Sequence, residues 1–176
     1  MSQWVAITVI GEDRPGIVAG VTKVLYDHGC NLEDSSAMRL RDEFAMILIA
    51  RLPNPPRLAE LEAALAATAE GLDVAVNVRD LGERVAQAPP AGRVRGLAVY
   101  GADRPGIVYQ VSERLAAARC NITDVTTHIA GEVYLLLLEM TVPDAVTDDD
   151  LRAALAELRA DLAVDITLRD LDEETL

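Results

Sequence analysis

Short apolar stretches and helical apolar patterns follow one another along this chain in a regular order. Val5 to Ile10 is apolar and β-branched and ends at a glycine, which is typical of a strand. Apolar residues then recur at helical spacing from Ile17 to Leu25, and Gly29 is placed to end that helix. Pro15 suits the first turn of the same helix. The pattern further predicts strands at residues 31–40 and 44–52, a helix at 58–65 and a strand at 72–78.

The same order returns after an offset of 90 residues. The octapeptide Gly-x-Asp-Arg-Pro-Gly-Ile-Val occurs at residues 11–18 and again at 101–108. Roughly a third of the aligned positions are identical over residues 11–81 and 101–171 without a gap, which favours two copies of one fold. The second copy predicts strands at 95–100, 121–130, 133–142 and 162–169, and helices at 105–118 and 148–161.

Each copy therefore has the predicted order βαββαβ. The simplest fold for this order is a four-stranded antiparallel sheet with both helices on one face. The expected class is α+β, with two ferredoxin-like domains at residues 1–81 and 95–171. The residues between them, 82–94, contain Ala-Pro-Pro-Ala-Gly and predict a stiff linker. Residues 172–176 form an acidic tail.

Two of the predicted strands are apolar along almost their whole length. They include Phe44 to Ala50 in the first copy and Val133 to Leu138 in the second. Because a strand that faces water on one side alternates apolar and polar residues, we expect both strands to be covered on both faces. The open faces or edges would then be buried by the other copy or by a second chain, which predicts a homo-oligomer.

Composition and charge narrow the classes of partner. The net charge of −13 and the pI near 4.5 oppose binding to phosphate backbones, so direct nucleic-acid binding is not expected. Aromatic residues make up only 3 % of the chain, which also disfavours an RNA-binding domain of this topology. No apolar run is long enough to span a bilayer, and the N-terminus lacks the features of a signal peptide. We expect a cytoplasmic protein without membrane contact.

The chain offers no recognisable catalytic device. It has no nucleophile with a base at a known spacing, no metal-ligand cluster and no glycine-rich nucleotide loop. His28 and His128 are not repeat equivalents, whereas Cys30 and Cys120 are, and both cysteines are expected to be small buried thiols. We therefore expect a non-enzymatic protein without metal or cofactor.

The repeated turn carries the candidate binding chemistry. The amides of Gly16 and Ile17 lie at a predicted helix start, where unpaired N–H groups and the helix dipole favour an anion such as a carboxylate. Glycine would let a ligand approach the backbone, and Asp13 offers a partner for an ammonium group. Asn31 starts the strand after the helix and could return near the same turn. The equivalent residues in the second copy are Asp103, Gly106, Ile107 and Asn121.

Other interpretations of the same residues stay open. Asp before Arg-Pro-Gly is also good turn and capping chemistry, with no ligand involved. Arg14 and Arg104 are either exposed charges or groups that grip a carboxylate or phosphate. The second alternative would fit a small ferredoxin-like enzyme of the acylphosphatase type, although Pro15 removes one backbone donor from a phosphate-binding loop.

A βαββαβ module in which the first strand leads into Asp-Arg-Pro-Gly-Ile-Val, followed by Cys-Asn-Leu or Cys-Asn-Ile, resembles the ACT domain, a small-molecule-sensing module of amino-acid metabolism. The resemblance implies a regulatory protein that binds a small amino acid of the glycine or serine type at interfaces between ACT domains and controls a protein partner. A regulatory fragment similar to the ACT part of formyltetrahydrofolate deformylase is an alternative. The binding residues implied are Asp13, Arg14, Pro15, Gly16, Ile17, Val18 and Asn31, with Asp103, Arg104, Pro105, Gly106, Ile107, Val108 and Asn121.

Overall fold

The computed structural model describes residues 3–83, 91–131 and 133–171. The chain divides into two compact units, Met1–Gln87 and Ala88–Leu176, which are called unit 1 and unit 2. The proline-rich part of the predicted linker and the acidic tail lie outside the described residues.

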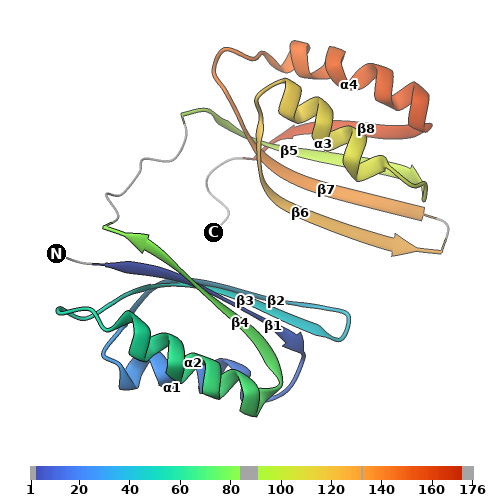
Figure 1. The fold of residues 1–176 in the computed structure, drawn as a ribbon. Coiled ribbons are helices and arrows are strands. Elements are labelled where there is room, and N and C mark those ends of the chain that lie inside the picture. The colour runs from blue at the N-terminus through green and yellow to red at the C-terminus, as the bar shows by residue number, and fades with distance from the viewer. Residues whose placement is uncertain (1–2, 84–90, 132, 172–176) are drawn as a thin grey trace. The chain divides into compact units, whose positions relative to one another are not determined.

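Unit 1 has the βαββαβ order that its apolar pattern predicts (Figure 1). Its strands form one antiparallel sheet in the order β2-β3-β1-β4. Trp4 lies opposite Arg51 at one end of this sheet, and Glu12 lies opposite Glu43 at the other end. The elements are β1 (Trp4–Glu12), α1 (Ile17–Asp27), β2 (Asn31–Leu40), β3 (Glu43–Arg51), α2 (Leu58–Leu72) and β4 (Val74–Gly82).

Unit 2 repeats this arrangement, with the sheet order β6-β7-β5-β8. Strand β4 reaches Gly82 and strand β5 begins at Arg93, so both strands extend into the range that the sequence assigns to the linker. The elements are β5 (Arg93–Ala102), α3 (Ile107–Ala117), β6 (Asn121–Ala130), β7 (Val133–Val142), α4 (Asp148–Leu162) and β8 (Val164–Asp170).

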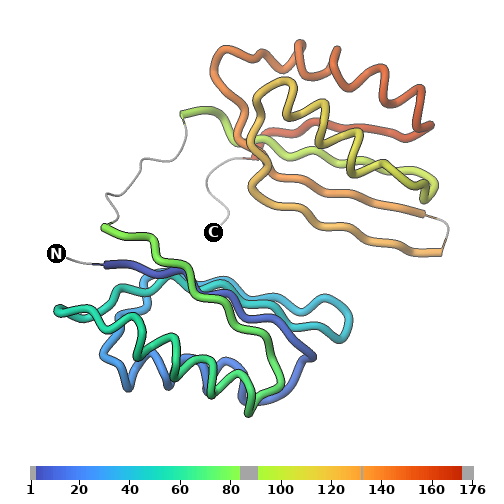
Figure 2. The backbone as a smooth tube through the Cα atoms, in the orientation of Figure 1, coloured from blue at the N-terminus to red at the C-terminus, as the bar shows by residue number. Residues whose placement is uncertain are grey.

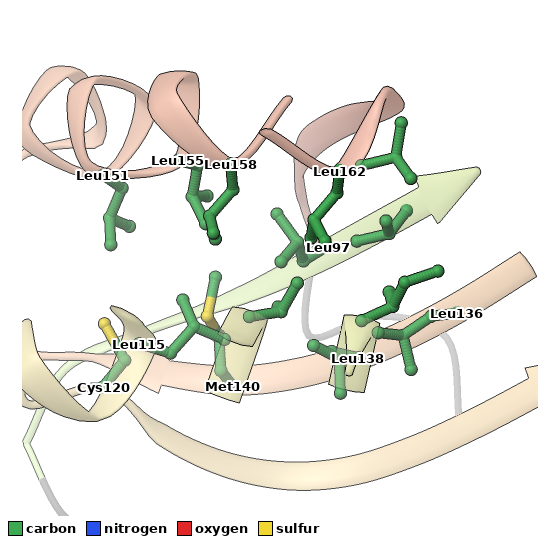
Figure 3. Close-up of a cluster of buried hydrophobic side chains, with 14 of the residues drawn as sticks. Leu97, Leu115, Cys120, Leu136, Leu138, Met140, Leu151, Leu155, Leu158 and Leu162 are labelled. Atoms are coloured by element: carbon green, nitrogen blue, oxygen red, sulfur yellow. The ribbon is translucent and has the colours of Figure 1, made fainter. Parts of the chain in front are cut away.

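Both helices of each unit lie on the same face of its sheet (Figure 2). Buried side chains of the helices and strands form the core. In unit 2, Leu151, Leu155 and Leu158 of α4 project toward the β7 side chains Leu138 and Met140 (Figure 3). Each unit has its own cluster of buried side chains. The predicted fold class, two four-stranded antiparallel sheets each with two helices on one face, is confirmed.

The face of each sheet away from the helices is open within its unit. Buried and exposed residues alternate along β3 and β7. Ile47 is 52 % exposed and Leu137 is 39 % exposed. Each unit by itself therefore leaves one face of these strands open, and their covering by the other copy or by a second chain stays a prediction. The apolar run is continuous in the sequence because isoleucine and leucine also occupy open-face positions.

The edge strand of unit 1 is the most exposed element of that unit. Every residue of β2 is exposed, and β2 stands at the end of the sheet order with β3 as its one neighbour. An exposed edge strand presents unpaired backbone N–H and C=O groups that can pair with another strand. Strand β6 holds the same position in unit 2.

Candidate functional site

The repeated motif forms the turn between the first strand and the first helix of each unit. Gly16 precedes α1 as its N-cap with a φ of 101°, and Gly106 precedes α3 with a φ of 95°. Glycine adopts this left-handed conformation without strain. A Cβ on Gly16 would meet no atom within 4 Å, so there is room for a larger residue. Glycine is required at this position by the backbone conformation.

No side chain caps either helix at this turn. The first N–H groups of an α-helix have no intrahelical acceptor, and together with the helix dipole they favour an anion. Pro15 precedes the N-cap Gly16, so it lies outside α1, and the prediction that it occupies the first turn of the helix is wrong. The turn therefore offers uncapped backbone donors, as a carboxylate site requires.

The hydrophobic residues of the motif divide between the core and the surface. Ile17 and Ile107 are each 2 % exposed and belong to the cores, so only their backbone groups are available to a ligand. Val18 and Val108 follow them in the helices and are exposed.

The charged residues of the first turn are paired with each other and with neighbouring strands. Arg14 contacts the carboxylates of Glu12 at 2.7 Å and Asp73 at 3.4 Å. The hydrogen bond and charge of Glu12, with a smaller effect of Asp73, raise the pKa of Arg14 above its ordinary value. Asp13 lies 3.5 Å from Arg39, and its amide donates to the Asp42 carbonyl at 2.8 Å.

Asn31 lies at the other end of the sheet from this turn. The register places Asn31 opposite Arg51, which in turn pairs with Trp4 at the start of β1. The turn follows Glu12, at the end of β1. Helix α1 carries the chain back to the end of the sheet at which β1 starts, and β2 begins there. A unit therefore does not bring its own Asn31 to its own turn. Asn121 holds the equivalent position in unit 2.

A polar cluster that the sequence does not predict surrounds the start of β2. The Glu33 carboxylate accepts hydrogen bonds from Trp4 Nε1 and Arg51 Nε, each at 2.7 Å. These bonds lower the pKa of Glu33, with a smaller contribution from Asn31. Glu33 sits at a register shift between β2 and β3, and such bulges redirect side chains. No periodicity in the sequence signals this contact, because it joins three different strands.

The remaining reactive side chains that the structure describes form no site. Cys30 and Cys120 are free, and burial raises the pKa of both thiols above the usual range. His28 bonds through Nδ1 to the Val24 carbonyl at 2.8 Å. Within the described ranges, no group of three or more His, Cys, Asp or Glu side chains is arranged to hold a metal ion. Over the same ranges, no helix has the length and apolarity needed to cross a membrane.

A model of the ACT domain family matches residues 3–79 and again residues 97–169. The chain belongs to the ACT domain family. The two matches coincide with unit 1 and unit 2, so this ACT protein is a tandem pair, as the internal repeat predicts.

The ACT protein is similar to several curated proteins, each over part of its length. A UPF0237 protein of Methanopyrus kandleri is 56 % identical over 46 residues, which are 26 % of this chain and 51 % of that protein. A UPF0237 protein of Methanosarcina mazei is 39 % identical over 74 residues, 42 % of this chain and 80 % of that protein. The glycine cleavage system transcriptional repressor of Escherichia coli is 44 % identical over 46 residues, 26 % of this chain and 24 % of the repressor. The chain thus spans about half the length of the first relative and about a quarter of the repressor.

Two solved structures match nearly the whole ACT protein. A protein from Galdieria sulphuraria, described only as unknown, has a TM-score of 0.81 and 26 % identity, and the match covers 97 % of this chain and 99 % of that one. A candidate glycine cleavage system transcriptional repressor has a TM-score of 0.77 at 19 % identity, with 97 % and 98 % covered. The second likeness shows a shared fold.

Proposed function

We propose that this ACT protein is a non-enzymatic sensor that binds a small amino acid of the glycine or serine type and changes its association with a protein partner. The observation that carries the proposal is the pair of uncapped helix starts at Gly16 and Gly106, each three residues after an aspartate. Uncapped N–H groups suit the carboxylate of a zwitterion, and an adjacent aspartate suits its ammonium group.

We propose that an ACT unit of a second chain completes the site. If two exposed edge strands pair antiparallel, the start of one strand lies beside the end of the other. Asn31, at the start of β2, would then lie near the turn of the neighbouring unit, because that turn is at the sheet end where β2 finishes. This arrangement explains how Asn31 and Asp13 act at one site although a single unit holds them apart. Asn121 and Asp103 play the same roles in the second repeat.

Edge pairing also explains how the sensor would respond to its amino-acid ligand. A ligand that touches two units favours the paired arrangement over the separated one, and it shifts that equilibrium by the difference in its affinities. We propose that a homo-oligomer forms through these edges and that the amino acid changes the surface offered to the partner. The similarity to the Escherichia coli repressor supports a partner in transcriptional control of glycine cleavage. An activator protein is the proposed contact, because the acidic chain does not suit DNA. The proposed location is the cytoplasm.

Catalysis on a phosphate receives no support from the first turn. Arg14, the residue that would grip the phosphate, is already held by Glu12 and Asp73. The loop also lacks the donor of Pro15.

Thermal unfolding in the presence of each common amino acid tests the proposal. A ligand that binds only the native state raises the unfolding temperature by mass action. Glycine, serine or another small amino acid should stabilise the chain selectively, and the Asp13→Ala plus Asp103→Ala double variant should lose the effect. No stabilisation by any amino acid would contradict the proposed function.

A further inference from the structure

The two motif turns share a sequence but differ in their charged surroundings. Three charged residues approach the turn in unit 1: Glu12, Arg39 and Asp73. At the offset of 90 residues, their counterparts in unit 2 are Ala102, Ile129 and Ala163. Every ion-pair partner of the first turn is therefore replaced by an apolar residue at the second turn.

The charged side chains of the first turn are held in ion pairs within unit 1. The guanidinium of Arg39 lies 3.5 Å from the Asp13 carboxylate, in the role that a ligand's ammonium group would take. Arg14 is shared between the carboxylates of Glu12 and Asp73. Each pair is exposed and individually weak, yet a ligand must displace them before it can use the same charges.

Asp103 and Arg104 form no ion pair with any residue that the structure describes in unit 2. One carboxylate and one guanidinium on adjacent residues are complementary to the two ends of a zwitterion. The neighbouring alanines and Ile129 carry no charge that could compete with a ligand for Asp103 or Arg104.

A buried phenol adds a polar group beneath the second turn. Tyr134 is 7 % exposed and pairs in register with Gly101, two residues before Asp103. No side-chain oxygen or nitrogen buried from solvent lacks a hydrogen-bond partner among the described residues, so the hydroxyl of Tyr134 is not a buried group without a partner. Burial first, and then the nearby charge of Asp103, raise the pKa of Tyr134. The unit 1 counterpart is Phe44, which has no hydroxyl.

We infer that the two turns are not equivalent, and that the unit 2 turn is the primary amino-acid site, with Asp103 contacting the ammonium group, Arg104 and the α3 amides contacting the carboxylate, and the Tyr134 hydroxyl serving as a further donor. This assignment rests on the proposed function and specifies which repeat carries it. The unit 1 turn is the ion-paired copy, in which Arg39 takes the place of a ligand cation.

Isothermal titration of the full chain with glycine and with L-serine tests the assignment. Asp103→Asn removes the charge-assisted contact and should weaken binding about tenfold or more. Asp13→Asn, the matched change in the other repeat, should alter the affinity less than about twofold. Unfolding temperatures of both variants establish that each remains folded.

Exchanges between the repeats provide a second test that preserves the packing. Tyr134→Phe installs the residue of unit 1 and should weaken binding about twofold to tenfold, the effect of one neutral hydrogen bond. Ile129→Arg supplies the missing cation beside Asp103 and should weaken binding about twofold to fivefold. Arg39→Ile in unit 1 should not weaken it.

The outcomes separate the assignment from the function on which it rests. Equal losses in Asp13→Asn and Asp103→Asn, or full binding by Asp103→Asn, would overturn the assignment while leaving an amino-acid sensor. Absence of binding to the unmodified chain would overturn both.

Discussion

The indole Nε1 of Trp4 donates a 2.7 Å hydrogen bond to the Glu33 carboxylate and so links the first strand of unit 1 to the bulge in its edge strand. Arg51, on the strand between them, donates to the other carboxylate oxygen. The counterparts in unit 2 are Val94, Thr123 and Thr141, which cannot reproduce this cluster. Because Trp4 is the single tryptophan of the chain, tryptophan fluorescence reports on the surroundings of this one indole.

Replacing Glu33 with threonine, the residue of the second repeat, should release the indole. We expect the Trp4 emission to shift and the unfolding temperature of unit 1 to fall, because Trp4 and Arg51 both lose their acceptor. Thr123→Ala is the control in unit 2 and should leave the emission unchanged. An unchanged spectrum in Glu33→Thr would show that the contact is not formed in solution.

Acid should remove the same stabilisation. The folded-state pKa of Glu33 lies below its usual value of 4.5, so its ionised form stabilises the fold fully above that value. The contribution is lost as the pH falls through the folded-state pKa. Glu33→Gln should therefore be less stable than the unmodified chain at neutral pH, and the two unfolding curves should converge in acid. A difference in stability that is the same at pH 3 and pH 7 would contradict this account.

The first glycine of the motif is required by close packing. A Cβ on Gly11 would lie 2.8 Å from the Val74 side chain and 3.1 Å from the Asp73 carbonyl oxygen at the start of β4. Gly11→Ala should lower the free energy of unfolding by about 1–3 kcal/mol, the usual cost of overpacking. Gly71→Ala is the matched control, since its Cβ meets nothing within 4 Å and it lies in α2. That change should raise stability by about 0.5–1 kcal/mol, and chemical denaturation measures both.

The second helices of the two units, α2 and α4, differ in their N-terminal capping. Thr147 and Asp150 form a capping box at α4, and the bonds from Thr147 lower the pKa of Asp150. Thr147→Ala should destabilise unit 2 by about 1 kcal/mol. The equivalent residue at α2 is Arg57, whose side chain makes no capping bond, so Arg57→Ala should change stability by less than about 0.5 kcal/mol. Equal effects of the two substitutions in calorimetry would contradict the capping assignment.

Edge pairing predicts a homo-oligomer. Light scattering at micromolar concentration should give a mass above that of one chain. Met38→Lys, which places a charge on the exposed edge strand β2, should lower that mass. Ile47→Lys alters the open face of β3 instead and should leave the mass unchanged. The opposite result would assign self-association to the open face.

Local patterns in the sequence were sufficient to predict the order of elements. The strand ending at Gly11 and the helix from Ile17 are confirmed, because alternation and helical spacing depend on near neighbours. The covering of both faces of β3 stays a prediction, since Ile47 is apolar yet exposed and a single unit does not cover it. An apolar residue indicates that a surface can be buried, but it does not indicate which element or chain buries it.

The candidate site was harder to predict, because it depends on where elements meet. The turn at Asp13 to Gly16 could be recognised from its repeated residues and its glycine. The place of Asn31 could not, since the direction of β2 and its pairing with β3 put it at the far end of the sheet. The contacts at the Glu33 bulge and the effect of replacing Arg39 by Ile129 could not be predicted from the sequence either. Both depend on the strand register, which decides which residues are neighbours.

Nuclear magnetic resonance of the isotope-labelled chain, titrated with glycine and with serine, tests the central claim most directly, because each backbone amide reports its own surroundings. We predict saturable shifts that are largest at Gly106 and Ile107, with smaller ones at Gly16 and at Asn121. Amides that do not shift with any small amino acid, or shifts confined to residues away from both turns, would contradict the account.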